Sequence, residues 1–138
     1  MYLIPNKFIN ECLEARLKAK QYLIKDSSTM VGATLYDKYG NSYSGFNIQN
    51  RSHKSYHAEE MAILNAILQG ANMKDMVGLL VSFSNNNIEK LTFCCGHCRQ
   101  IVWEYTLNPN LLVSEITLDG GVIETRKLSE LYPQPYPR

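Results

Sequence analysis

Three of the four cysteines of this chain lie within five residues, in the segment CCGHC at 94–98. A Cys-x-x-Cys pair such as Cys95 and Cys98 can form a disulfide, act as a redox pair, or supply two thiolates to a metal ion. The disulfide is the least favoured, because the first residues, MYLIPNKF, lack the apolar run of a secretory signal and predict a reducing cytoplasm. The spacing of the two cysteines alone leaves the redox and metal interpretations open.

A histidine elsewhere in the chain favours the metal. His57, in the segment YHAEEMA, begins a predicted helix, and Cys95 and Cys98 begin another that comes too late in the chain for a thioredoxin-like pair. If the two helix N-termini meet across a sheet, they offer one nitrogen and two sulfurs. Three protein ligands and an open fourth position are typical of catalytic zinc, whereas four closed ligands are typical of structural zinc. Helix N-termini also favour thiolates, because their N–H groups stabilise negative charge.

Glu59 lies two residues after His57, close enough to reach a water molecule at such a zinc ion without ligating the metal. Zinc can lower the pKa of water from 15.7 to about 7, and a neighbouring carboxylate can pass the water's proton to a substrate. Taken singly, His57 is explained as a surface or capping histidine, and Glu59 as a carboxylate that the helix dipole favours. The combination at two helix starts predicts a zinc-dependent hydrolase.

Alternating helices and strands must position these residues. Apolar periodicity predicts helices over 5–24, 57–70 and 98–107. Apolar or alternating runs bounded by turn residues predict strands over 30–37, 42–50, 76–83, 111–118 and 122–128. This order predicts a three-layer α/β/α fold with a mixed central sheet, built by residues 1–138 as a single domain. Cys12 falls on the apolar stripe of the first helix and is expected to be buried.

Composition excludes several classes of function. The chain has 138 residues, of which 45% are hydrophobic, so it can bury a core without cross-links. Fourteen basic and thirteen acidic residues leave a formal charge of +1, which argues against a nucleic-acid polymer as partner. No apolar run approaches the length of a membrane span. The expected protein is cytoplasmic and acts on a small molecule.

The motifs resemble those of the cytidine deaminase family. CGHCRQ at 95–100 resembles the second zinc motif of the family, and HAE at 57–59 resembles the first. MVGATL at 30–35, GFNIQN at 45–50 and LSELYPQPY at 128–136 resemble further segments. The resemblance implies that His57, Cys95 and Cys98 hold Zn²⁺ while Glu59 moves protons. Hydroxide would attack C4 of cytosine and ammonia would leave, giving uridine or deoxyuridine for pyrimidine salvage.

The resemblance also implies a set of substrate-binding residues. Asn47 lies where the family has a ribose-binding asparagine, and Gln49 lies where it has a glutamate. Thr29 replaces a phenylalanine that packs against the base, and Ala58 lies between the two residues of the first motif. Tyr136 corresponds to a terminal aromatic residue that reaches toward a neighbouring subunit. Gln49 keeps an acceptor oxygen without the charge, and Thr29 removes a stacking surface.

Other departures concern the metal. Cys94 replaces the proline before the second motif and is expected to be structural, since a fourth thiolate would close the site. Small members of the family usually have cysteine as first ligand and an arginine after the catalytic glutamate, where this chain has His57 and Glu60. Two thiolates and a neutral imidazole already balance Zn²⁺, so no arginine is required. Histidine as first ligand resembles the dimeric branch of the family, whereas the chain length resembles the tetrameric branch. A homotetramer is the favoured hypothesis, and a dimer is the alternative.

Two rival functions stay open. The changes at Thr29 and Gln49 are also compatible with a deaminase of a modified aminopyrimidine nucleoside, such as a blasticidin-like antibiotic, or of a nucleotide. A non-catalytic zinc-binding module is a rival from another class. Glu59 argues against that module, because a structural zinc site has no use for a proton carrier beside an open coordination position.

Overall fold

A five-stranded sheet forms the centre of the computed structural model, which describes residues 3–24, 29–85 and 91–137. Its strand order is β2-β1-β5-β6-β7, in which β5 and β6 are parallel and the other neighbours antiparallel. The strands are β1 (Val31–Asp37), β2 (Ser42–Phe46), β5 (Met76–Phe83), β6 (Leu112–Ile116) and β7 (Val122–Lys127). The prediction of a mixed central sheet is confirmed.

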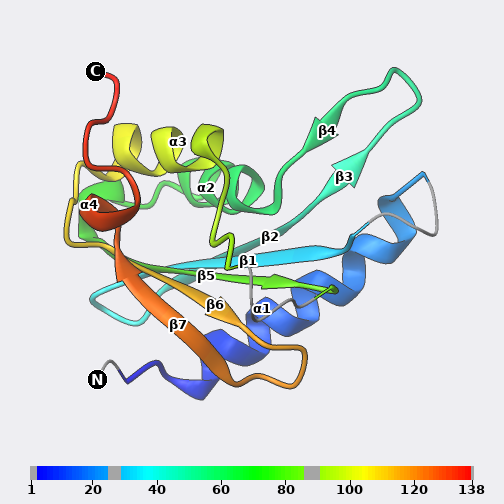
Figure 1. Cartoon of the computed structure of the whole chain (residues 1–138), viewed down its shortest axis with the longest axis horizontal. Coiled ribbons are helices and arrows are strands. Elements are labelled where there is room, and N and C mark those ends of the chain that lie inside the picture. The colour runs from blue at the N-terminus through cyan, green and yellow to red at the C-terminus, as the bar shows by residue number, and fades with distance from the viewer. Residues whose placement is uncertain (1–2, 25–28, 86–90, 138) are drawn as a thin grey trace.

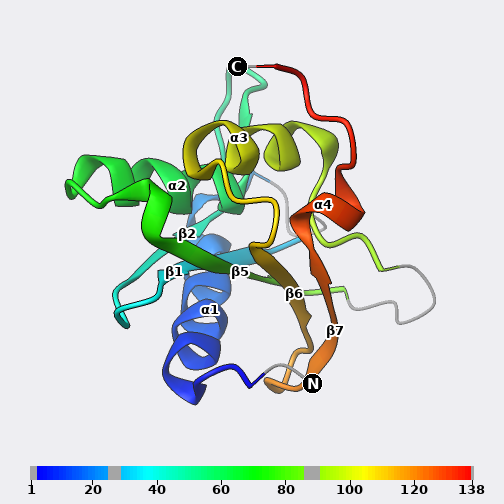
Figure 2. The same ribbon diagram turned by 90° about the vertical axis from the view of Figure 1, so that its left-hand side faces the viewer.

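Helices cover both faces of this sheet (Figure 1). One face carries α1 (Asn6–Lys18), and the opposite face carries α2 (Ala58–Leu68) and α3 (Gly96–Thr106). The view turned by 90° shows the same three layers, with the sheet between them (Figure 2). The remaining helical segments are short: η1 (Ala19–Tyr22), η2 (Met73–Asp75) and α4 (Leu128–Leu131).

The inner strands are buried because helices cover them on both sides. Residues of β1, β5 and β6 pack with α2 and α3 into the larger apolar cluster, which includes Leu35, Ile63, Leu79, Val102 and Val113. A smaller cluster lies beneath α1 and contains Phe8, Ile9, Cys12, Tyr36, Leu80 and Ile116. Cys12 is fully buried in this second cluster, as expected from its place on the apolar stripe.

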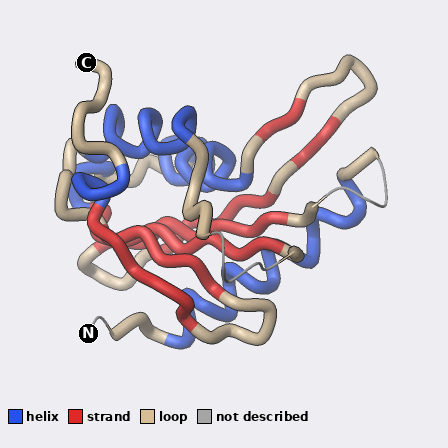
Figure 3. Tube along the Cα trace, viewed as in Figure 1, coloured by secondary structure: helices blue, strands red, loops and turns tan. Residues whose placement is uncertain are grey.

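The predicted strand over 42–50 is wrong in its second half. The strand β2 ends at Phe46, and β3 (Ile48–Gln49) pairs instead with β4 (Ser55–Tyr56) in a separate two-stranded sheet. Asn47 lies at the break, where its side chain bonds to the backbone of Thr29 and Val31. The hairpin β3–β4 projects away from the layers and leads the chain to α2 (Figure 3).

Two helix boundaries also differ from the predictions. The helix expected over 5–24 ends at Lys18 and continues only as the 3-10 turn η1. The helix expected over 98–107 begins at Gly96 and ends at Thr106, because Leu107 takes a left-handed backbone with φ of 50°. The helix therefore ends before Pro109 is reached. Its first turn includes Gly96 and His97, the residues between Cys95 and Cys98.

Gly45 lets α2 lie directly on β2. A Cβ atom at this position would lie 2.4 Å from the Ala62 nitrogen and 2.6 Å from the Ala58 carbonyl oxygen. Both contacts are backbone atoms of α2, which no side-chain rotation can move. The absence of a side chain at Gly45 therefore determines how closely the first turn of α2 approaches the sheet.

We expect Gly45→Ala to destabilise the protein by about 1–3 kcal/mol or more, because the added methyl group overlaps helix backbone. Urea unfolding followed by circular dichroism measures this loss. Gly96→Ala is the control, since a Cβ there meets no atom within 4 Å. Equal unfolding midpoints for the two variants would show that α2 can shift without cost.

Candidate metal centre

Three potential ligands converge from two helix starts. His57 precedes the first residue of α2, Cys95 precedes the first residue of α3, and Cys98 lies in the first turn of α3. The His57 Nδ1 atom lies 3.3 Å from the Sγ atoms of both Cys95 and Cys98. All three ligand atoms lie within 4.8 Å of one another.

These distances fit zinc. Tetrahedral Zn²⁺ with bonds of about 2.3 Å to sulfur and about 2.0 Å to nitrogen places ligand nitrogen and sulfur roughly 3.5 Å apart. Among the described residues, no fourth His, Cys, Asp or Glu joins the group, which therefore offers three ligand atoms. This donor set matches that of catalytic zinc, which keeps one coordination position for water or substrate.

The loop that carries the cysteines is held from two sides. On one side the buried Glu115 carboxylate accepts the backbone N–H groups of Thr92 and Phe93, at 3.1 and 3.0 Å. The two hydrogen bonds stabilise the backbone at Phe93, which is buried in a left-handed conformation with φ of 53°. On the other side Arg99 donates to three backbone carbonyls, those of Cys94, Leu131 and Thr92. The cysteines therefore lie on a fixed backbone.

Two of the ligands, His57 and Cys95, line a cavity of about 800 Å³, whose walls come from strand ends and helix starts. Of the residues predicted to bind substrate, Thr29, Asn47, Gln49 and Ala58 line it together with Glu59. The cavity volume lies in the range of small-molecule sites. Tyr136 does not line it; the Tyr136 side chain is 74% exposed, and its backbone is anchored to Gln100.

The comparisons with known proteins identify this site. Residues 6–112 match the family model of the cytidine and deoxycytidylate deaminase zinc-binding region. The chain belongs to this family. It is therefore a zinc-dependent deaminase of the cytidine deaminase type, and the prediction of an enzyme with a zinc cofactor is confirmed.

Solved structures agree with this assignment. The deaminase is similar to the cytidine deaminase of Burkholderia pseudomallei at 26% identity, with a TM-score of 0.81 over 97% of this chain and 100% of that chain. The cytidine deaminase of Mycobacterium leprae shares the fold, at 23% identity and a TM-score of 0.70, over 94% of this chain and 97% of that chain. The cytidine deaminase of Mycobacterium tuberculosis also shares the fold, at 19% identity and a TM-score of 0.70, over 96% of this chain and 97% of that chain. No curated protein matches the chain in sequence.

Burial controls the protonation of the groups around the ligands. The Glu59 side chain is almost fully buried, and this burial raises the pKa of its carboxyl, although contacts with Cys98 and His57 oppose the shift. Burial also raises the pKa of the Cys98 thiol, and the charge of Glu59 adds to the effect. The N–H groups of the helix start favour the thiolate and oppose this effect. A bound Zn²⁺ reverses this balance, because a coordinating thiol is deprotonated.

Cys94 differs from its two neighbours. Its side chain is buried, and burial with the nearby Glu59 charge raises the pKa of its thiol to about 12. It does not belong to the ligand group that His57 forms with the other two cysteines. A thiol in this state packs as a small apolar group, which supports a structural role.

Sequence reasoning missed several residues of the deaminase cavity. The cavity is also lined by residues that were not predicted: Ser55, Tyr56, Phe83, Leu91, Thr92 and Arg99. Arg99 stood within the quoted zinc motif, so the motif itself could have indicated it. Phe83 had no such signal, because it reaches the cavity only through the pairing of β5 with β1, in which Phe83 lies opposite Val31.

None of the described helices is long and apolar enough to cross a membrane.

We expect Cys95→Ser and Cys98→Ser to reduce bound zinc well below one ion per chain, because each leaves only two strong ligands. Atomic emission spectroscopy of the purified proteins measures the zinc content. Cys94→Ser is the matched control and should keep the wild-type zinc content. Loss of zinc in the Cys94 variant, or full zinc in both ligand variants, would contradict the assigned ligand set.

Proposed function

We propose that this deaminase converts cytidine and deoxycytidine to uridine and deoxyuridine with release of ammonia, for pyrimidine salvage in the cytoplasm. Residues 1–138 form its single catalytic domain. The observation that carries the proposal is the three-ligand metal site that opens onto the cavity beside the buried carboxyl of Glu59. A structural zinc site needs neither feature.

The reaction needs a group that moves protons beside the metal. Hydrolysis forms a bond between C4 of the base and the oxygen of water, breaks the bond from C4 to the amino nitrogen, and releases ammonia. Zn²⁺, when bound, lowers the pKa of a water molecule to about 7. Glu59 takes a proton from the water and delivers it to the departing nitrogen. Burial raises the pKa of the Glu59 carboxyl and so favours its taking up a proton, as the first step requires.

The sugar is held at the start of the β3–β4 hairpin. The Asn47 Oδ1 atom accepts the Val31 N–H at 2.8 Å, and its Nδ2 atom donates to the Thr29 carbonyl at 2.7 Å. An amide oxygen has a second lone pair and an amide nitrogen a second hydrogen, so Asn47 can also bind a ribose hydroxyl. Gln49 lies beside it and lines the same cavity. Its neutral side chain supplies weaker polar contacts than the glutamate it replaces.

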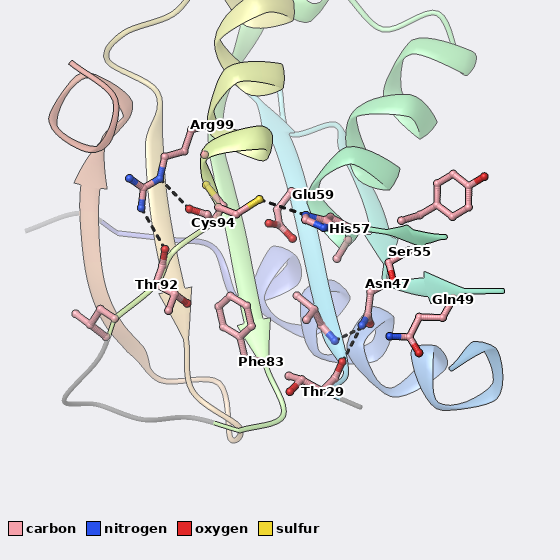
Figure 4. Close-up of a pocket in the computed structure, with 16 residues that line it drawn as sticks. Thr29, Asn47, Gln49, Ser55, His57, Glu59, Phe83, Thr92, Cys94 and Arg99 are labelled. Carbon is pink, nitrogen blue, oxygen red and sulfur yellow. Dashed lines mark hydrogen bonds between the residues drawn. The ribbon is translucent and has the colours of Figure 1, made fainter. Parts of the chain in front are cut away.

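The base packs between the zinc ligands and the ends of the inner strands. Ala58 lines the cavity with only a methyl group, which leaves room for a pyrimidine ring beside His57. Thr29 provides no aromatic face, but the ring of Phe83 points into the cavity from the adjacent strand (Figure 4). We assign to Phe83 the stacking surface that is missing at position 29. Stacking of a base on an aromatic side chain contributes about 1–3 kcal/mol.

A nucleotide substrate is the second candidate, beside a modified aminopyrimidine nucleoside. A second hollow adjoins the cavity and shares the walls formed by Gln49 and Ser55. Arg51, His53 and Lys54 line this hollow and are exposed on the hairpin. Basic side chains next to the sugar end of the cavity suit a phosphate group.

The proposed assembly is a homotetramer, with a dimer as the alternative. The exposed Tyr136 lies on a C-terminal segment that Gln100 fixes from α3: the Tyr136 N–H donates to Gln100 Oε1 at 3.0 Å, and its carbonyl accepts from Nε2 at 3.1 Å. A tail fixed by its backbone presents its aromatic side chain outward. This arrangement supports a contact of Tyr136 with the cavity of a neighbouring subunit.

We expect the zinc-loaded enzyme to convert cytidine and deoxycytidine to uridine and deoxyuridine, with products separated by chromatography. Glu59→Gln should keep zinc and lose about 10²–10⁴-fold in kcat, because the amide cannot carry a proton. Product from cytidine monophosphate alone would favour the nucleotide candidate. Unchanged turnover in the Glu59 variant would remove the proton-transfer role, and a zinc-loaded protein inert on every aminopyrimidine would remove the proposed function.

We expect Phe83→Leu to raise KM for cytidine about tenfold and to change kcat little, because leucine keeps the apolar volume but has no aromatic face. Phe83→Tyr keeps the ring and should keep a KM close to that of the wild type. Steady-state kinetics at equal zinc content measures the difference. An unchanged KM in the leucine variant would show that the base does not stack on Phe83.

A further inference from the structure

One carboxylate connects the two helix starts that carry the zinc ligands. The Glu60 Oε1 atom accepts the backbone N–H of His57 at 2.7 Å. The other oxygen, Oε2, lies 3.1 Å from the Nε2 atom of His97. Glu60 belongs to the first turn of α2, whereas His97 belongs to the first turn of α3, between Cys95 and Cys98. The Glu60 side chain thus touches the backbone of one ligand and the segment that holds the other two.

Stability alone gives little reason for this pair. The His97 side chain is 58% exposed and the Glu60 side chain 17% exposed. Ion pairs at the protein surface contribute about 0–1 kcal/mol to stability, and the exposure of His97 places this pair near that class. The location of the pair is more informative than its energy, because its two ends lie next to all three ligands. The rings of His57 and His97 also lie edge to face with centroids 5.8 Å apart, which gives α2 and α3 a second contact at the same point.

We propose that Glu60 and His97 are positioning residues for the zinc ion. The bridge from Glu60 to His97 holds the starts of α2 and α3 at the separation at which His57, Cys95 and Cys98 meet the metal together. Glu60 accepts the backbone N–H of His57, and this hydrogen bond also restricts where the His57 imidazole can lie. Groups that orient metal ligands from outside the coordination sphere typically change metal affinity about 10–100-fold when they are removed.

Glu60 is the third helical residue of α2 and closes a capping box there, so its bond to the His57 N–H also satisfies the helix start. With a histidine as first ligand the site needs no arginine at position 60, but this argument does not require a glutamate there. The contacts of Glu60 give that glutamate two partners, and the second of them depends on the histidine at position 97. The sequence EE at 59–60 therefore combines a buried carboxyl that faces the cavity with a partly buried carboxylate that joins two helices.

The experiment measures zinc affinity by competition with a chromophoric chelator, with no nucleoside present, on the full chain. His97→Ala should raise the zinc dissociation constant about tenfold or more. His97→Gln, which can still donate a hydrogen bond to Glu60, should recover much of the affinity. Glu14→Ala, which removes an exposed carboxylate from α1 on the opposite face of the sheet, is the control and should leave the affinity unchanged.

A double-mutant cycle tests whether the two residues act through one bridge. Glu60→Ala should weaken zinc binding at least as much as His97→Ala, and the double variant should be no weaker than Glu60→Ala alone. In His97→Ala, the ligand-field absorption of the Co²⁺-substituted protein should shift. The thermal unfolding midpoint of the metal-free His97→Ala protein should equal that of the metal-free wild type. An unchanged zinc affinity in His97→Ala, or fully additive effects in the double variant, would overturn the proposal. Because no substrate is used, inactivity toward cytidine does not affect this test.

Discussion

The direct contact between α2 and β2 at Gly45 determines where the chemistry of this protein takes place. Helix backbone lies against strand backbone at this point, so any side chain at position 45 would push the first turn of α2 away from the sheet. That turn carries Glu59 into the interior and follows His57 at the end of the β3–β4 hairpin. The thiolates must then reach His57 from the start of α3. Arg99 and Glu115 meet this requirement by holding the preceding loop from its two sides.

Two buried carboxyls next to this loop show how environment separates structure from chemistry. Glu115 accepts two backbone N–H groups and so holds the left-handed residue Phe93 in place. Glu59 is buried as deeply but faces the cavity, and burial raises the pKa of its carboxyl. The proposed proton transfer uses Glu59, because its side chain reaches the cavity, whereas Glu115 is committed to backbone donors. Their positions in the fold assign the two roles.

The sequence predicts the metal site better than the cavity that surrounds it. Each motif lies at one helix start, so local spacing predicts the ligands His57, Cys95 and Cys98, and the order of helices and strands predicts the mixed sheet. The place of Phe83 depends instead on the register of β5 against β1, which no local pattern contains. The break at Asn47 is similar: the apolar alternation continues through it, but a side-chain contact with Thr29 and Val31 ends the strand. Long-range contacts decide both features.

The division between helix starts and strand ends has a consequence for how substrate preference can change. The metal ligands and Glu59 lie at the starts of α2 and α3. Thr29 and Phe83 lie at neighbouring ends of the inner strands, and Asn47 and Gln49 lie where the hairpin begins. A substitution at a strand end alters the wall of the cavity without touching the contacts that join the two helices. In the proposed function, the aromatic face at Phe83 takes the place of one at position 29 while the zinc site stays unchanged. The proposed roles thus assign substrate selection and hydrolysis to separate sets of contacts, and the departures at Thr29 and Gln49 belong to the first.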